Sequence, residues 1–382
     1  MTAGKCVPGG DCLAVHENKT VFIEGAIPGE EVEVRVTREK TNLLYARVTR
    51  VLKPSPERVE PVCPHVQLCG GCQYQHMSYA EELRWKEAQV RETFRRVLNS
   101  DRVAPIVSSS QPYGYRRSAT FHAVGGGRGK KPFFSYIGKD NVSAVMLKQC
   151  DLLDPALARM VLDVPMNAAG KIGYKLSETG SVVDDRKESF FRVTLSERSL
   201  LAHSQAFFQN NRAVTELLAA RAAEWVQQVS PQVFFDLYAG VGTFSFLCAR
   251  DVAKVFAVEE NRQAVSALRM NRDEDKWEAL GIVEGRVERV FPELWEKEGR
   301  ADSVLLLDPP RQGMEKGLCE YLAKKVEAKR LIYISCDPAT LVRDLKTLAI
   351  QGAWKLKTVV PFDMFPRTKH VEAAALLYYN EA

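Results

Sequence analysis

Long apolar runs are missing from this sequence. None of its 382 residues falls in an uninterrupted apolar stretch of 18 or more, the length at which a membrane-spanning helix becomes a candidate. Residues 1–10 also lack the apolar core of a secretory signal peptide. We therefore expect a cytoplasmic protein with no membrane partner.

A strong charge imbalance is missing as well. The net charge is only +5, from 53 basic and 48 acidic residues. The basic residues are unevenly distributed, since seven Lys or Arg and a single acid, Asp140, lie between Val103 and Lys148. Such a local field suits a polyanion such as a nucleic acid. A solvated basic face is an equally good interpretation.

The paired C-x2-C units of a structural zinc site are absent, although the chain has nine cysteines. In a cytosolic chain we expect ligands, nucleophiles or packing residues and not disulfides. Three cysteines instead follow the spacing C-x5-C-x2-C, and a fourth lies far downstream. These candidate metal ligands are Cys63, Cys69, Cys72 and Cys150. This set suits an iron–sulfur cluster. The alternatives are zinc held by the same four cysteines and small buried thiols. His65 or His76 could also replace a cysteine as a ligand.

The first half of the chain has two patterns typical of RNA-binding proteins. Short strands are predicted at residues 21–23, 31–36 and 45–52, with basic residues in the second half of this unit, which fits a small β-barrel that follows a nucleic-acid backbone. After a predicted helix at 79–99, residues 113–136 interleave aromatic side chains with Arg and Lys. Aromatic side chains stack on unpaired bases, and cations hold phosphates. The alternative is a sheet core with a basic outer face, and the glycines at 125–127 are predicted to form a flexible turn.

From about residue 206 apolar strands alternate with helices, which predicts a doubly wound α/β domain with a mostly parallel sheet. The strand Val233–Leu237 is followed by Gly240, Gly242 and a helix at 244–250, the layout of a nucleotide-binding crevice. Glu259 ends the next strand, where an acid accepts hydrogen bonds from ribose hydroxyls. Ser245 occupies the place of the third glycine of a nicotinamide site.

Two further strands end in reactive side chains. Asp308 follows one of them in an Asp-Pro-Pro-Arg loop, a type of loop with which methyltransferases hold their substrate or the methionine end of their cofactor. Cys336 follows the next strand and precedes a helix, so we expect a lowered thiol pKa and a competent nucleophile. A buried packing thiol is the alternative. His370 and Glu372 are both candidates for a general base.

Together these motifs resemble the S-adenosylmethionine-dependent RNA uracil-5-methyltransferases, in the branch with an N-terminal TRAM domain and an iron–sulfur cluster. Residues 22–30 resemble the TRAM core, 335–338 the nucleophile motif and 370–372 the motif of the base. The resemblance implies a [4Fe-4S] cluster on the four cysteines, Cys336 as nucleophile and Glu372 as base. The cofactor contacts that it implies are Gln209, Tyr238, Glu259 and Asp308, beside Gly240 and Gly242. The family's Tyr-Arg-Asn-Lys motif stands here as residues 115–118, Tyr-Arg-Arg-Ser.

The resemblance also implies an architecture and a reaction. A TRAM-like β-barrel would occupy residues 1–53, a central α+β domain with the cluster 54–200, and a Rossmann-like class I methyltransferase domain 201–382. We expect a monomer that methylates C5 of a uridine in 23S ribosomal RNA, through a covalent bond between Cys336 and C6. The alternatives are the same reaction on transfer RNA, an amino-group methyltransferase that uses residues 308–311, and a non-catalytic RNA-binding assembly factor.

Overall fold

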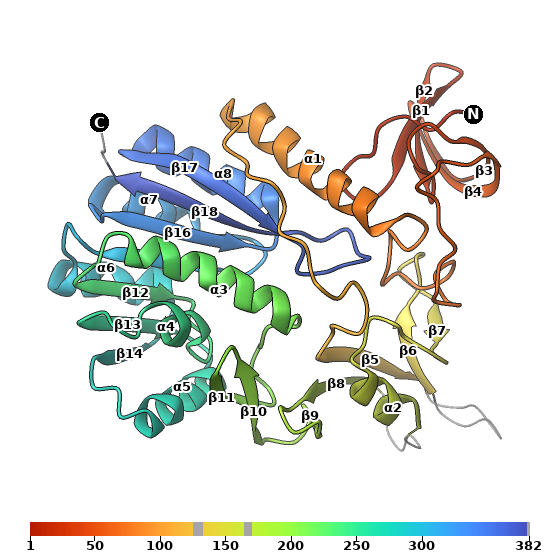
Figure 1. The fold of residues 1–382 in the computed structure, drawn as a ribbon. Coiled ribbons are helices and arrows are strands. Elements are labelled where there is room, and N and C mark those ends of the chain that lie inside the picture. Colours follow the sequence, from red (N-terminus) through yellow and green to blue (C-terminus); the bar gives the residue numbers. More distant parts are fainter. Residues whose placement is uncertain (125–132, 164–169, 380–382) are drawn as a thin grey trace.

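The computed structural model of the chain describes residues 1–124, 133–163 and 170–379. The N-terminal sheet and the large C-terminal sheet lie at opposite ends of the molecule, with a third sheet beside the first (Figure 1). The long helix α1 (Tyr79–Leu98) lies between the two ends. Within the described residues, no helix has the length and apolar character needed to cross a membrane.

Four strands form the N-terminal sheet in the order β1-β2-β4-β3. Their bounds are β1 (Cys12–His16), β2 (Lys19–Glu24), β3 (Glu31–Lys40) and β4 (Leu43–Lys53). On β2, Val21 and Ile23 are buried and Phe22 between them is only partly covered, because successive side chains of a strand point to opposite faces. The strands predicted in this unit are confirmed.

The central sheet has five antiparallel strands in the order β7-β6-β5-β8-β9, and helix α2 packs against β8. The bounds are β5 (Ser118–Val124), β6 (Phe133–Ile137), β7 (Ala144–Met146), α2 (Pro155–Asp163), β8 (Gly170–Leu176) and β9 (Val182–Asp184).

Three aromatic residues of this region are core residues. Phe121 and Phe134 are buried with ring centroids 5.4 Å apart, and Tyr115 is buried in a separate cluster with Cys72 and Leu152. The prediction that aromatic rings of this region stack on RNA bases is therefore wrong for these three, and strand alternation explains why Phe121 and Phe134 point into the interior. The glycines at 125–127 and the cations Arg128, Lys130 and Lys131 lie outside the described residues.

Seven strands form the C-terminal sheet in the order β14-β13-β12-β15-β16-β18-β17. The bounds are β12 (Val233–Leu237), β13 (Lys254–Glu259), β14 (Leu280–Glu284), β15 (Val304–Leu307), β16 (Arg330–Ser335), β17 (Trp354–Phe362) and β18 (Glu372–Tyr379). Neighbours from β14 to β16 pair in parallel, and β18 is antiparallel to both β16 and β17. The predicted doubly wound sheet is confirmed. Its strand order reverses between β12 and β15, the point at which such sheets bind ligands.

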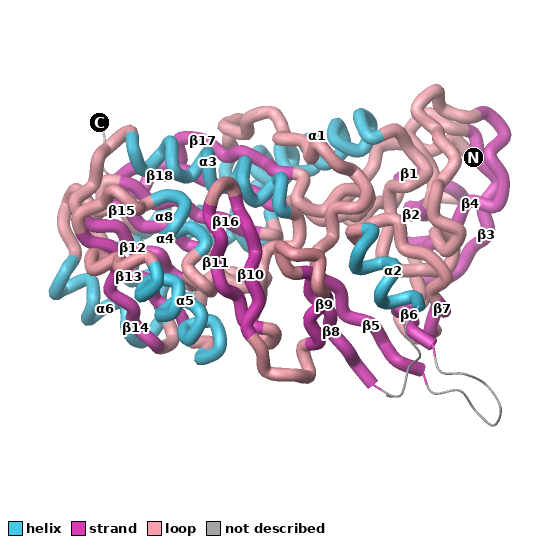
Figure 2. The backbone as a smooth tube through the Cα atoms, turned by 60° about the horizontal axis from the view of Figure 1, so that its bottom comes forward, coloured by secondary structure: helices cyan, strands magenta, loops and turns pink. Residues whose placement is uncertain are grey.

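Helices cover both faces of this sheet (Figures 1 and 2). One face packs against α3 (Arg212–Gln227), α4 (Thr243–Cys248) and α5 (Arg262–Glu274), and the other against α6 (Val287–Glu298), α7 (Lys316–Lys325) and α8 (Pro338–Gln351). Helix α1 joins the second layer, since its Val90 and Phe94 share a core with Leu341 of α8. The hairpin of β10 (Phe190–Leu195) and β11 (Arg198–His203) packs on α3 and α5, so it crosses the domain boundary expected at residue 200.

Candidate functional site

A cavity of about 430 Å³ lies at the carboxyl ends of β12, β13, β15 and β16. It brings together all but one of the residues predicted for catalysis and cofactor binding. Those that line it are Gln209, Tyr238, Gly240, Glu259, Asp308, Cys336 and Glu372. The exception is Gly242, which has φ 89° at the N-cap of α4. A Cβ at this position would lie 2.5 Å from Leu268 Cδ1, so this glycine allows α4 and α5 to pack closely.

The glycine turn after β12 orients the carboxylate of Glu259. The backbone N–H of Gly240 donates to Glu259 Oε2 at 2.8 Å, and the N–H of Asn261 donates to Oε1 at 2.7 Å. Both oxygens are therefore held at the edge of the cavity, where an acid binds ribose hydroxyls in this type of fold. Tyr238, with φ 67°, donates its hydroxyl to Glu288 Oε1 at 2.6 Å.

Ser245 has a definite role at the position where a nicotinamide site has its third glycine. Its N–H and its hydroxyl both donate to Asp236 Oδ2, at 2.8 and 2.6 Å. Asp236 is fully buried, and burial raises the pKa of its carboxyl to about 6. This serine therefore compensates a buried acid beneath the cavity.

Carboxyl groups outnumber cations in the described lining of this cavity, which contains Glu259, Glu260, Asp308 and Glu372 but Arg311 as its single cation. Burial and the charge of Asp236 raise the pKa of Asp308 to about 7, and burial and the charge of Asp308 raise the pKa of Glu372 well above its ordinary value. Gln209 Nε2 donates to Asp308 Oδ2 at 3.4 Å. Because neighbouring carboxyls resist ionisation without a countercharge, the site favours a ligand that carries positive charge.

The register of β16 and β18 brings the predicted nucleophile and base together. Ser335 pairs with Ala373, so Cys336 and Glu372, which flank this pair, reach the same edge of the sheet. Asp337 caps α8, as predicted, by accepting from the N–H groups of Ala339 and Thr340.

The prediction of a lowered thiol pKa at Cys336 is wrong for the free protein. Burial, followed by the charges of Glu372 and Asp308, raises the pKa of Cys336 to about 12. The helix N-terminus gives little help, because the Asp337 side chain already accepts from N–H groups of the first turn. Among the described residues, Arg311 is the one cation that lowers this pKa, and its effect is smaller than those of burial, Glu372 and Asp308.

The two candidates for a general base lie in different surroundings. His370 lines a second cavity that also contains Cys336, and its Nδ1 is 3.3 Å from Arg311 Nη2. Burial and the nearby cations lower the pKa of His370 to about 4, so the ring is neutral. Glu372 lines the first cavity together with Asp308 and Cys336.

All four predicted metal ligands line one small enclosed cavity between the loop 63–72 and the central sheet. Three buried polar atoms of the same lining have no hydrogen-bond partner among the described residues: Arg116 Nε, Tyr136 Oη and Asp151 Oδ2. His65 lines the cavity, whereas His76 lies elsewhere, with Nε2 3.3 Å from the Ala26 carbonyl. Among the described residues, no three His, Cys, Asp or Glu side chains converge closely enough to hold a single metal ion.

The loop that carries these cysteines also holds the segment that leads to Glu372. Gln73 Nε2 donates to the Gly70 carbonyl at 2.8 Å, and its Oε1 accepts from the N–H of Lys369 at 3.0 Å. The N–H groups of Gln73 and Tyr74 both donate to the Arg367 carbonyl. The cysteine loop and the segment that leads to Glu372 are therefore one connected unit.

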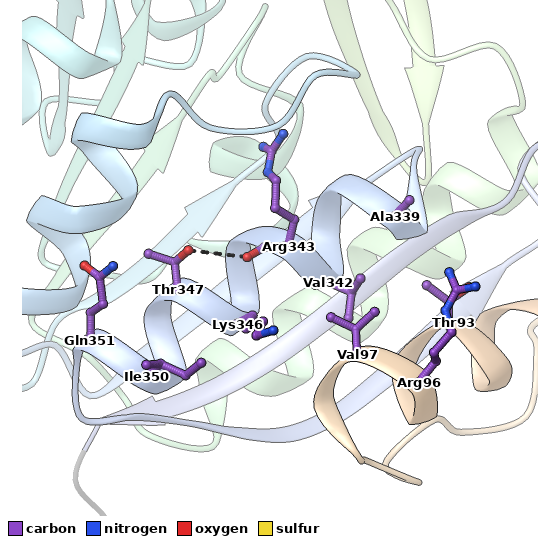
Figure 3. Close-up of a pocket in the computed structure, with 10 residues that line it drawn as sticks. All are labelled: Thr93, Arg96, Val97, Ala339, Val342, Arg343, Lys346, Thr347, Ile350 and Gln351. Carbon is purple, nitrogen blue, oxygen red and sulfur yellow. Dashed lines mark hydrogen bonds between the residues drawn. The ribbon is translucent and has the colours of Figure 1, made fainter.

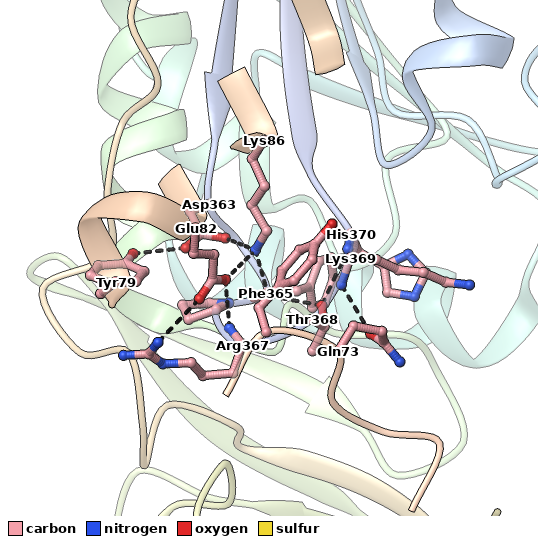
Figure 4. Close-up of polar contacts among 12 residues, drawn as sticks. Gln73, Tyr79, Glu82, Lys86, Asp363, Phe365, Arg367, Thr368, Lys369 and His370 are labelled. Atoms are coloured by element: carbon pink, nitrogen blue, oxygen red, sulfur yellow. Dashed lines mark hydrogen bonds and ion pairs between the residues drawn. The ribbon is translucent and has the colours of Figure 1, made fainter. Parts of the chain in front are cut away.

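A buried ion network fixes the other side of the segment (Figure 4). Lys86 Nζ lies 2.7 Å from Glu82 Oε1 and 2.6 Å from Asp363 Oδ1, and all three side chains are completely buried. The N–H of Arg367 donates to Glu82 Oε1, and Tyr79 donates to Asp363 Oδ2. No motif in the sequence indicated this network. The available signal was spacing, because Glu82 and Lys86 precede Val90 and Phe94 at intervals of four on the buried face of α1.

Comparisons with known proteins agree with this geometry. Residues 186–380 match the family model "tRNA (Uracil-5-)-methyltransferase", and residues 4–49 match the TRAM domain. An uncharacterized RNA methyltransferase of Clostridium tetani is 30% identical, covering 97% of this chain and 94% of the relative. The 23S rRNA (uracil(1939)-C(5))-methyltransferase RlmD of Edwardsiella ictaluri is 29% identical, covering 96% of this chain and 92% of the relative.

Among solved structures, the Pyrococcus abyssi tRNA (uracil-54, C5)-methyltransferase in complex with S-adenosyl-L-homocysteine has the same fold, with a TM-score of 0.74, 20% identity and 99% coverage of both chains. The chain therefore belongs to the tRNA (uracil-5-)-methyltransferase family and is an S-adenosylmethionine-dependent RNA methyltransferase with an N-terminal TRAM domain.

Proposed function

We propose that this enzyme methylates C5 of a specific uridine in 23S ribosomal RNA, with Cys336 as nucleophile and Glu372 as general base. The observation that carries this proposal is the shared cavity, in which Cys336, Glu372 and the cofactor-side residues Gln209, Glu259 and Asp308 all meet. The choice of ribosomal RNA is supported by relatives that are named as 23S rRNA methyltransferases and align over nearly the whole chain.

Cys336 acts first in this mechanism. C5 of uracil is a weak nucleophile, and addition of the Cys336 sulfur to C6 places an electron pair on C5. S-adenosylmethionine supplies the electrophilic methyl group that C5 accepts. Glu372 then removes the C5 proton, and the electron pair of the C5–H bond restores the C5–C6 double bond and expels the Cys336 thiolate.

The charges of the cavity explain how the thiol is activated. The raised pKa values of Asp308, Glu372 and Cys336 all reflect burial together with accumulated negative charge. A cationic cofactor in the same cavity offsets this negative potential, because an opposite charge favours the ionised form of an acid. Cofactor binding would therefore lower the pKa of Cys336 toward its ordinary range before the target base enters.

A covalent trap tests this division of roles. Glu372→Gln should pass through addition and methylation and then remain bonded to RNA, giving a slow band on denaturing gels. That band should be absent in Cys336→Ala and in the double variant. Methyl transfer by Cys336→Ala, or a band that survives its loss, would overturn the mechanism. Parallel reactions on 23S ribosomal RNA and on transfer RNA distinguish the two substrates.

We also propose that Cys63, Cys69, Cys72 and Cys150 bind a [4Fe-4S] cluster. A cubane cluster is wider than a single ion and needs four sulfurs around one volume. The proposal is supported by the fact that all four cysteines line one cavity. Arg116 Nε and the Tyr136 hydroxyl are buried donors in the same lining, and a cluster would offer them sulfur acceptors. It would not account for Asp151 Oδ2.

Metal analysis tests the cluster directly. Protein purified without oxygen should be brown and contain about four irons per chain. Cys69→Ser should lose iron, whereas Cys6→Ser, outside the cavity, should keep it. Stoichiometric zinc without iron in the wild-type protein would contradict this proposal.

A further inference from the structure

A trough runs from the catalytic cysteine along the groove between α1 and α8. It begins in the second cavity, of about 350 Å³, which shares Cys336 and Arg311 with the cofactor cavity. It continues into a groove of about 540 Å³ that shares Thr93, Arg96 and Ala339 with the second cavity. The three hollows therefore adjoin one another, and together they extend from Cys336 to the outer groove.

The walls of this trough carry excess positive charge. Arg96 on α1 and Lys346 on α8 are exposed, and their side chains form no hydrogen bond or ion pair with any residue the structure describes. Lys369 and Arg311 add positive charge near Cys336. Within the described lining of the second cavity and the outer groove, Asp337 is the single carboxylate, and it is engaged in capping α8.

The floor of the outer groove is apolar. Val97 of α1 and Val342 of α8 lie between the two helices, and Ile350 near the end of α8 is 70% exposed (Figure 3). Arg343 lies on the side of α8 away from α1 and donates to Asp344 Oδ1 and to the Gln312 carbonyl, so it is already occupied. Unpaired cations above an apolar floor match the phosphates and base faces of a single strand.

We infer that this trough holds the RNA strand on one side of the target uridine, with Arg96 and Lys346 as phosphate contacts. This inference rests on the proposed function, because a uridine at Cys336 remains joined to its neighbours and its strand must leave the cavity. Helix α8 has 14 residues, so the groove extends for about 21 Å, enough for several nucleotides.

The test measures binding of a single-stranded RNA oligonucleotide with one central uridine to the full-length protein, by fluorescence anisotropy over a range of salt. Each phosphate contact to a single strand contributes about 0.7 to the slope of log affinity against log salt. Arg96→Gln combined with Lys346→Gln should therefore lower the slope by about 1.4. The ratio of wild-type affinity to variant affinity should then be about 25-fold larger at 0.1 M than at 1 M salt.

Two comparisons locate the effect. The first comparison uses oligonucleotides that lack the nucleotides on one side of the uridine. The loss of affinity caused by the double substitution should disappear when one flank is removed and persist when the other is removed. The matched control is Arg221→Gln with Arg269→Gln, on α3 and α5 across the sheet, where both arginines form surface ion pairs. It should bind like wild type.

An unchanged affinity and slope in the Arg96 and Lys346 double variant would overturn the inference, because the trough would then not bind the RNA strand. An equal loss of affinity for both truncated RNAs would overturn it as well, since that result indicates a general electrostatic attraction and not a contact with one flank. The covalent band of Glu372→Gln measures the reaction, and this titration measures RNA binding. A failure of the proposed function is therefore distinguishable from a failure of the proposed RNA-binding trough.

Discussion

Replacement of Lys86 by methionine should destabilise the protein strongly, although the residue does not line the cofactor cavity. The substitution keeps an unbranched side chain that is shorter by one atom, and it removes the ammonium that lies 2.7 Å from Glu82 and 2.6 Å from Asp363. Two completely buried carboxylates would then face one another with Arg367 as the remaining cation of the network. Removing one partner of a buried ion pair costs about 3–5 kcal/mol, because the remaining charge stays desolvated.

The same substitution should slow catalysis. Asp363 begins the segment that leads to Glu372, and Lys86 Nζ also donates to the Phe365 carbonyl at 3.1 Å. We expect kcat to fall, since Glu372 loses a support, while the affinity for S-adenosylmethionine stays close to wild type. Urea unfolding measures the loss of stability, and single-turnover methylation measures the catalytic effect.

A paired variant provides the control. Glu82→Gln added to Lys86→Met removes one carboxylate charge together with the ammonium, so it should recover part of the lost stability. A Lys86→Met protein within about 1 kcal/mol of wild type would refute the reasoning. A double variant less stable than the single variant would refute it too, because charge imbalance would then not be the cause.

Two further predictions concern the cofactor cavity. Glu259→Ala should weaken S-adenosylmethionine binding by about 1–3 kcal/mol, the scale of a hydrogen bond to a charged group, and unchanged affinity by calorimetry would exclude this contact. Because burial and Asp236 raise the pKa of Asp308 to about 7, and a cationic ligand prefers the ionised carboxyl, cofactor affinity should rise with pH until Asp308 is ionised. Below that pKa the rise should approach about tenfold per pH unit, and it should become shallower in Asp308→Asn. An affinity in wild type that does not change between about pH 5.5 and 7.5 would contradict this assignment.

Much of the C-terminal domain was predictable because its signals are local. The strand Val233–Leu237 begins and ends where the apolar run does, and Asp337 with Pro338 marks the start of α8 through capping chemistry alone. The carboxyl ends of parallel strands lie at one edge of a sheet, so Glu259, Asp308 and Cys336 could be assigned to a single crevice from the sequence alone.

The central region was harder to interpret, because interleaved aromatic and basic residues fit both an RNA surface and a sheet core. In the structure Phe121 and Phe134 are core residues, since strand register determines which face of the sheet each ring occupies. The thiol pKa of Cys336 was predicted with the wrong sign for a similar reason. A helix N-terminus is visible in sequence, but burial and the approach of Glu372 are not.

The sequence by itself determined the order of elements, the crevice and the identity of the side chains that line it, because each depends on neighbours within one strand, turn or helix. The tertiary structure alone decided that Lys86 meets Asp363, 277 residues away, and that the cysteine loop holds the backbone of Lys369 through Gln73. It alone also decided that α1 and α8 form one trough beginning at Cys336. These contacts join segments that no local pattern relates, since they arise only when the helices and the sheet pack together.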